Sequence, residues 1–351
     1  MTENKNGRQS IIDLWRIVAC VCLLVHHSYL VREANTLYPL YRSLIFIDFF
    51  FILTGYYTAK HFVEQEFSDR GKEEFGYFFR KFVGFLPYTI IAVLVQYLVE
   101  SYQYLGGGIK SFIGNFYDMP LEMLFLTESY VQGAHMVPIW FLSAMFIAFP
   151  VFLLILRIKD KYIVLFLSLV YCAIFYNHFG IMGSRVWPKD IFRALAGLLF
   201  GTFLLILNQI IKQNNIIIKQ KKTECGLAVI EVGCMLVIVT AAFCNWNNLE
   251  KNMMLMLGVI VLISTSGYSL TARLNSSIIT YLGKLTLPIY IFQWPVGYLI
   301  SVIYKAKFGE DIGVVPIMYR LIPYYVGTLV VSVSIFETVR RIKIKKSNKV
   351  A

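Results

Sequence analysis

Long apolar runs dominate this sequence and leave few folds open to it. Of 351 residues, 58% are hydrophobic and 15% charged, which is too apolar for a water-soluble domain of this length. A run of about 20 apolar residues is enough for one helix to cross a bilayer. Such runs lie at 11–31, 40–59, 82–99, 138–156, 162–179, 191–211, 226–243, 253–270, 278–303 and 321–339. The sequence therefore predicts an all-α, polytopic membrane bundle of about ten transmembrane helices.

Other features narrow the class of protein further. The runs lack the strand alternation of a membrane β-barrel. The first run lacks the small-residue cleavage site of a signal peptide, so we expect it to be retained. Six cysteines occur without the paired spacing of a zinc site or a disulfide framework. We expect these cysteines to pack in the core and expect no metal site. Prolines inside the runs can kink the helices.

The distribution of basic residues predicts the orientation of the chain. With the N-terminus in the cytoplasm, most Lys and Arg residues fall in inner segments, as the positive-inside rule requires. We therefore expect a multi-pass protein of the cell membrane with both termini cytoplasmic: residues 1–10 as an N-terminal segment, 11–340 as the transmembrane domain and 341–351 as a basic tail. Contacts with membrane lipid account for the basic clusters, so the +12 net charge requires no nucleic-acid partner.

One predicted span contains ionisable residues, in the stretch DLWRIVACVCLLVHHSYL at 13–30. At about 100° per residue, Arg16 and His27 lie on one helix face, about 16 Å apart along the axis. Asp13 lies three residues before Arg16, within reach of an ion pair. Ionisable groups inside a span are often functional. The alternatives are a structural ion pair near the membrane edge for Asp13 and Arg16, and a core histidine for His27.

Several segments together resemble the acyltransferase family 3 membrane proteins. The first is a pattern in the family's first span, an arginine and a histidine separated by ten residues. Arg16 and His27 match this pattern. The others are IDFFFILTGYY at 47–57, YFFRKFVGFLPY at 77–88, PIWFLSAMF at 138–146 and YLGKLTLPIYIFQWPV at 281–296. The resemblance covers about residues 11–340. Gln293 stands where many members carry histidine, and Gly84 where many carry an additional arginine.

The resemblance implies an integral membrane O-acyltransferase. Such an enzyme moves an acyl group, most often acetyl, from cytosolic acyl-CoA to a hydroxyl of a cell-surface or lipid-linked carbohydrate. Acetyl-CoA is then a donor substrate, with no tightly bound cofactor. The expected partners are membrane lipid, the carbohydrate acceptor and proteins of envelope glycan synthesis. The alternatives are a carrier or flippase for a glycan or lipid precursor, and a catalytically altered relative, which Gln293 and Gly84 favour.

The candidate catalytic residues are His27 and Arg16. A neutral histidine can accept a proton from an alcohol near neutral pH, so His27 is the expected general base, or the group that first receives the acyl chain. Arg16 would hold an anionic or carbonyl part of the donor, since guanidinium stays charged and offers forked hydrogen-bond donors. The candidate substrate-binding residues are Asp13, Thr54, Arg80, Lys81, Trp140, Tyr290 and Gln293.

Structural roles compete with binding at several of these positions. Asp13 would orient Arg16. Arg80 and Lys81 would attract the donor's phosphates, although a topology signal is the stronger alternative. Thr54 precedes Gly55, a pair that also suits close packing against a neighbouring helix. Trp140 is a stacking platform for a sugar or an interfacial anchor.

Overall fold

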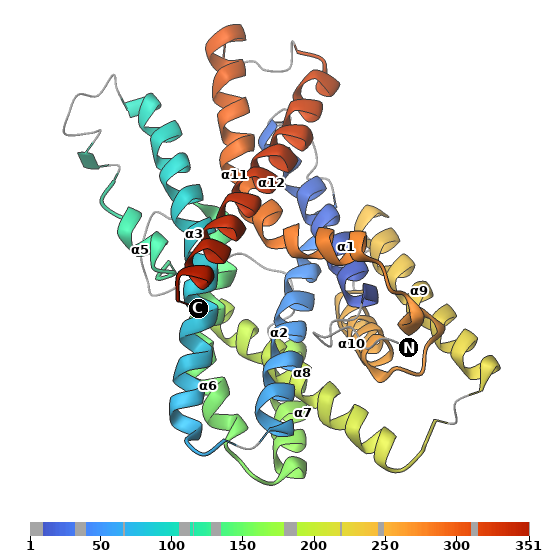
Figure 1. Ribbon diagram of the computed structural model, residues 1–351. Coiled ribbons are helices and arrows are strands. Elements are labelled where there is room, and N and C mark those ends of the chain that lie inside the picture. Colours follow the sequence, from blue (N-terminus) through green and yellow to red (C-terminus); the bar gives the residue numbers. More distant parts are fainter. Residues whose placement is uncertain are drawn as a thin grey trace. The chain divides into compact units, whose positions relative to one another are not determined.

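The computed structural model is helical throughout its ordered elements (Figure 1), and no residue that it describes lies in a strand. This confirms the all-α prediction. The structure describes residues 10–31, 40–65, 67–104, 113–114, 116–127, 135–178, 188–217, 220–244, 249–309 and 315–350. The predicted N-terminal segment therefore lies almost wholly outside the described residues.

The long helices follow the apolar runs. They are α1 (Ser10–His27), α2 (Ile45–Glu64), α3 (Arg70–Tyr104), α6 (Trp140–Leu156), α7 (Lys161–His178), α8 (Lys189–Gln213), α9 (Lys221–Cys244), α10 (Glu250–Ser266), α11 (Ser277–Phe308) and α12 (Ile317–Val350). Shorter elements join them: η1 (Ser28–Val31), η2 (Tyr41–Leu44), α5 (Met119–Met123), η4 (Val137–Ile139) and η5 (Leu270–Arg273).

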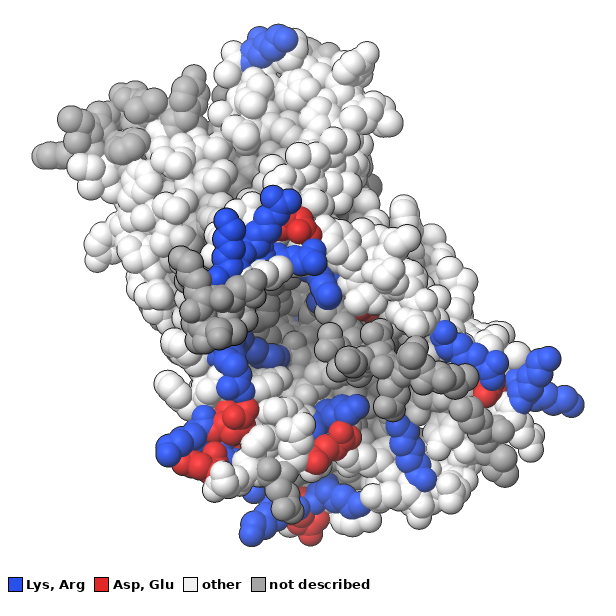
Figure 2. Space-filling model, viewed as in Figure 1, with Lys and Arg blue, Asp and Glu red and all other residues white. Residues whose placement is uncertain are grey.

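Among the described residues, 8 helical segments are long and apolar enough to cross a membrane. They comprise α1, α3, η4 with α6, α7, α8, α9, α11 and α12. The two remaining predicted spans fall on α2 and α10. Asp48, Lys60 and His61 lower the hydropathy of α2, and α10 has only 17 residues. The chain is a polytopic helical protein. Figure 2 shows wide uncharged surface between groups of charged side chains.

Two helices extend beyond the runs that predicted them. The charged stretch before residue 82 lies outside the apolar run at 82–99 but is helical from Arg70, where the backbone N–H of Lys72 donates to Asp69 Oδ1 at 3.0 Å. This cap starts α3 early because a side-chain carboxylate satisfies a free N–H of the first turn. The helix α12 likewise continues to Val350, through most of the predicted tail.

The prolines do not end the helices that contain them, and the expectation for two of the cysteines is wrong. The helices α3, α6 and α11 continue through Pro87, Pro150, Pro288 and Pro295. All six cysteines are free thiols, and Cys20, Cys22 and Cys172 are buried as expected. The core-packing expectation is wrong for the exposed Cys225 and Cys244, because much of α9 faces outward.

The chain divides into two compact units. Unit 1 comprises residues 1–22, 40–75 and 144–284, and unit 2 comprises 23–39, 76–143 and 285–351. The boundary falls within α1, so each unit contains one of the two candidate catalytic residues: Arg16 in unit 1 and His27 in unit 2.

In unit 1, α2 and α8 pack with their backbones in contact. A Cβ at Gly55 would lie 2.0 Å from the carbonyl oxygen of Leu198, and one at Gly201 would lie 2.1 Å from that of Ile52. Only glycine allows this approach, which is the small-residue packing of membrane helices. The buried Arg193 of α8 also donates from Nη2 to Asp48 Oδ2 of α2 at 2.5 Å. The packing alternative for the Thr54–Gly55 pair is therefore confirmed at Gly55.

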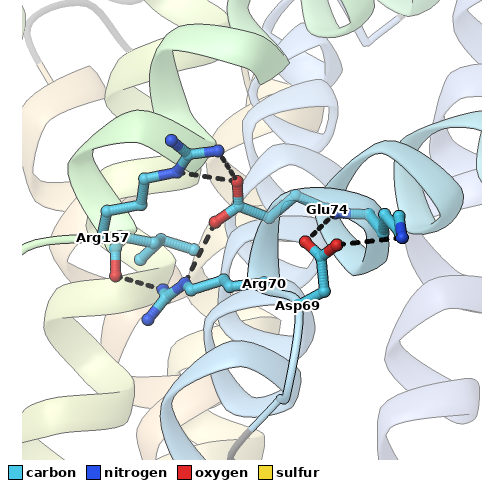
Figure 3. Close-up of polar contacts among 6 residues, drawn as sticks. Asp69, Arg70, Glu74 and Arg157 are labelled. Carbon is cyan, nitrogen blue, oxygen red and sulfur yellow. Dashed lines mark hydrogen bonds and ion pairs between the residues drawn. The ribbon is translucent and has the colours of Figure 1, made fainter.

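A second ionic contact of unit 1 joins the start of α3 to the end of α6. Figure 3 shows the Glu74 carboxylate between two guanidinium groups. Arg157 Nη2 donates to Glu74 Oε2 at 2.6 Å, and Arg70 Nε donates to Oε1 at 3.0 Å. Arg70 Nη2 also donates to the carbonyl oxygen of Leu156 at 2.5 Å. Arg70 and Arg157 are among the basic residues counted as topology signals, and the buried Glu74 carboxylate therefore neutralises part of their positive charge.

Candidate active site

His27 lies in a buried, mainly aromatic environment in unit 2. It is the last residue of α1 and is 5% exposed. Its Nδ1 lies 2.7 Å from Nε2 of Gln293 in α11. The ring centre of Tyr290 lies 6.0 Å away, and that of Trp294 lies 5.9 Å away with its plane edge-on. The histidine is therefore held by a polar contact to Gln293 and lies among aromatic rings.

The sequence of α11 explains how these three side chains reach His27. Tyr290, Gln293 and Trp294 are spaced i, i+3 and i+4, so they lie on one face of the helix. Tyr290 and Gln293 were expected to bind substrate, and the structure brings both to His27. Trp294 was missed, although its position one turn after Tyr290 was a sufficient signal. Phe141, in the segment 138–146, extends the aromatic lining with its ring edge-on to Tyr290 at 5.0 Å.

Trp294 connects His27 to a polar cluster that sequence reasoning did not assemble. Its indole Nε1 donates to the carbonyl oxygen of His135 at 3.1 Å. The His135 ring pairs through Nδ1 with the Glu100 carboxylate, which also accepts from Gln96 Nε2 at 2.6 Å. No periodicity in the sequence indicated that α3 would supply the partners of His135.

A second carboxylate fixes the backbone of the same loop. Glu122 Oε1 accepts from the N–H of His135 at 2.5 Å, and Oε2 accepts from the N–H of Met136 at 3.1 Å. Burial raises the pKa of Glu122, and the two backbone donors oppose that rise. We name Gln96, Glu100, Glu122 and His135 the His135 cluster. It holds the chain that leads into α6 next to Trp294.

Unit 1 contains the predicted ion pair of α1. Arg16 Nη1 lies 3.1 Å from Asp13 Oδ1, and Asp13 is completely buried. A Cβ at Gly283 would lie 2.6 Å from Asp13 Cβ, so the backbone of α11 passes directly beside this carboxylate. The pairing is confirmed, while the role of Arg16 toward a substrate stays a prediction.

A buried carboxylate of α9 holds the residue next to Arg16. Glu231 Oε1 accepts from the indole Nε1 of Trp15 at 2.7 Å, and Oε2 accepts from Ser269 Oγ at 3.2 Å and from Thr271 Oγ1 at 2.5 Å. An acidic residue inside an apolar run is a signal for a buried polar contact. The hydrogen bond from Trp15 to Glu231 fixes the rotation of α1 and therefore the direction in which Arg16 points.

The other predicted binding residues lie elsewhere. Thr54 is half-buried in α2 of unit 1. Arg80 is exposed in α3, and Lys81 Nζ lies 5.4 Å from the centre of the Tyr77 ring. Along α3, Arg80 is about 24 Å from Gln96 of the His135 cluster.

Two further observations complete the site. Trp140 is 8% exposed at the start of α6, so its ring is largely enclosed by protein. Within the described residues, no group of three or more His, Cys, Asp or Glu side chains is arranged to hold a metal ion.

The fold and the family comparison define the class of protein. Residues 9–337 match the Acyl_transf_3 family model, described as an acyltransferase domain. The protein is therefore a multi-pass membrane acyltransferase. More narrowly, the chain belongs to acyltransferase family 3, because the match covers nearly its whole length. No curated protein and no solved structure gave a significant match.

Proposed function

We propose that this acyltransferase moves an acetyl or related acyl group from cytosolic acyl-CoA to a hydroxyl of a cell-surface or lipid-linked carbohydrate. Its place is the cell membrane, with both termini in the cytoplasm. The observation that carries the chemical part of the proposal is His27, a buried histidine oriented by a hydrogen bond in a chain of an acyltransferase family. The acceptor class is inferred from the family resemblance.

In this proposal His27 acts as general base. Its Nε2 takes the proton of the acceptor hydroxyl while that oxygen attacks the thioester carbonyl. The tetrahedral intermediate collapses with cleavage of the C–S bond, and the leaving thiolate takes the proton from the imidazolium. The products are an ester and free CoA, so His27 returns to its neutral form. Neutral imidazole is the form that accepts the proton.

Arg16 would bind the donor. Its guanidinium stays charged, and Asp13 holds one of its nitrogens at 3.1 Å, which fixes the direction of the others. A phosphate of CoA or the thioester carbonyl is a suitable acceptor for these donors. Glu231 supports the arrangement through Trp15, because it fixes the rotation of α1.

The test uses purified protein in lipid nanodiscs with radiolabelled acetyl-CoA and an envelope glycan fraction. We expect His27→Ala to lower transfer by about 10²- to 10⁴-fold, the usual contribution of a positioned general base. His178→Ala is the matched control, because His178 is an exposed histidine at the end of α7. Arg16→Ala should raise the KM for acetyl-CoA. Transfer by His27→Ala at the wild-type rate would refute the mechanism.

A further inference from the structure

The contact between Gln293 and His27 has a direction that matters for catalysis. The amide Nε2 of Gln293 lies 2.7 Å from His27 Nδ1, and an amide nitrogen can only donate. Nδ1 is then the acceptor, so the neutral ring carries its hydrogen on Nε2. A ring in this tautomer has no lone pair at Nε2 with which to take the hydroxyl proton. In the arrangement that the structure shows, His27 therefore cannot act as a base through Nε2, and we call this arrangement the resting one.

The oxygen of the same Gln293 amide is the hydrogen-bond acceptor that a base at Nε2 requires opposite Nδ1–H. Within the described part of the chain, Gln293 Oε1 is buried and has no hydrogen-bond partner. Half a turn about the last side-chain bond exchanges the oxygen and the nitrogen within almost the same space, and this torsion is soft. Oε1 would then accept from Nδ1–H. The hydrogen bond to His27 is kept, and the Nε2 lone pair becomes available.

We propose that Gln293 is a positioning residue that selects the tautomer of His27, and that turnover uses the amide orientation opposite to the one in the structure. This inference rests on the proposed function of His27 as a base. Gln293 does not exchange a proton itself, so a glutamine in place of the family's histidine still serves the reaction. It acts as the orienting group of a base does in hydrolases that hold a histidine by its Nδ1–H.

The surroundings of His27 favour control of its tautomer by a neutral side chain such as that of Gln293. The rings of His26, Tyr290 and Trp294 lie with their centres 5.1, 6.0 and 5.9 Å from that of His27. Among these rings, the hydrogen bond between Gln293 and Nδ1 has a large effect on which nitrogen of His27 holds the proton.

Two substitutions separate this role from packing. Gln293→Glu replaces the amide with a carboxylate that only accepts when ionised, so it should hold His27 with the hydrogen on Nδ1. Gln293→Met keeps the length of the side chain but offers no comparable partner. We expect Gln293→Met to lower kcat by about 10- to 100-fold, as loss of an orienting partner does, with the KM for acetyl-CoA near wild type. Gln293→Glu should remain active.

The pH profile provides a readout that packing does not move. The carboxylate of Gln293→Glu stabilises the imidazolium form of His27 relative to the neutral form. Because the base works in its neutral form, the rise of kcat/KM with pH should move to higher pH in Gln293→Glu. Gln293→Met with wild-type kcat and an unchanged pH profile would show that Gln293 only fills space.

Nitrogen-15 NMR of histidine-labelled protein tests the tautomer without any activity. The chain has only 5 histidines, so the His27 signals can be assigned from His27→Gln. We expect the hydrogen on Nε2 in the resting wild type and on Nδ1 in Gln293→Glu. An Nε2–H tautomer in both proteins would overturn the inference. If wild type transfers no acyl group but the tautomer changes as expected, the proposed function fails and the orienting role of Gln293 stands.

Discussion

Replacing Gly283 with alanine tests whether the Asp13–Arg16 pair serves the acyl donor. The new Cβ would lie 2.6 Å from Cβ, Cγ and Oδ1 of Asp13, far inside van der Waals contact. Asp13 Cβ is fixed to the backbone of α1, so the side chain cannot simply swing away. Overpacking of this kind costs about 1–3 kcal/mol. Arg16 would lose the carboxylate that holds it at 3.1 Å.

The assay compares thermal unfolding and donor kinetics in purified Gly283→Ala. We expect a lower Tm. If the strain is expressed in donor binding, the KM for acetyl-CoA should rise by about 5- to 150-fold, because about 1.4 kcal/mol corresponds to a factor of ten. Gly226→Ala is the matched control, since a Cβ at this helical glycine of unit 1 meets nothing within 4 Å. Wild-type Tm and KM in Gly283→Ala would show that the close approach at Asp13 is unimportant.

Two other substitutions test the buried carboxylates. Asp48→Asn removes the charge that compensates buried Arg193, so it should destabilise the protein by about 3–5 kcal/mol; an unchanged Tm would contradict this. In Glu122→Gln only one amide oxygen accepts, so the N–H of His135 or Met136 loses its partner at a cost of about 1–3 kcal/mol. Burial raises the pKa of Glu122, so its contribution to stability is full below the ordinary glutamate pKa and is lost as pH rises through the raised value. Glu122→Gln should flatten that decline in a series of Tm measurements from acid to neutral pH, and an unaltered slope would refute the assignment.

The features that the sequence predicted are local in the chain. Apolar runs mark helices in lipid, and the spacing of Asp13 and Arg16 places them on one face, as the ion pair at 3.1 Å confirms. The ends of α3 and α12 were not predicted, because hydropathy marks the part of a helix that lies in lipid and not its full length. A cap such as Asp69 extends a helix into a polar stretch that hydropathy alone treats as a connection.

The contacts that build the site connect residues far apart in the chain. His27 and Gln293 are 266 positions apart, and Arg193 and Asp48 are 145 apart. Periodicity places each residue on a face of its own helix but does not say which other helix that face meets. The family resemblance pointed to Gln293 and Tyr290 individually. Their grouping around His27 required the structure, as did the His135 cluster, whose members come from α3, α5 and the chain before α6.

The two exposed thiols of α9 give the protein built-in reporters of its orientation. Cys225 lies in the second turn of the helix and Cys244 is its last residue. Nineteen residues of helix separate them by about 28 Å, close to the thickness of the hydrocarbon core of a bilayer. If α9 spans the membrane, the two sulfur atoms face opposite compartments. A water-soluble maleimide that does not cross membranes therefore distinguishes the two sides of the bilayer without any engineered cysteine.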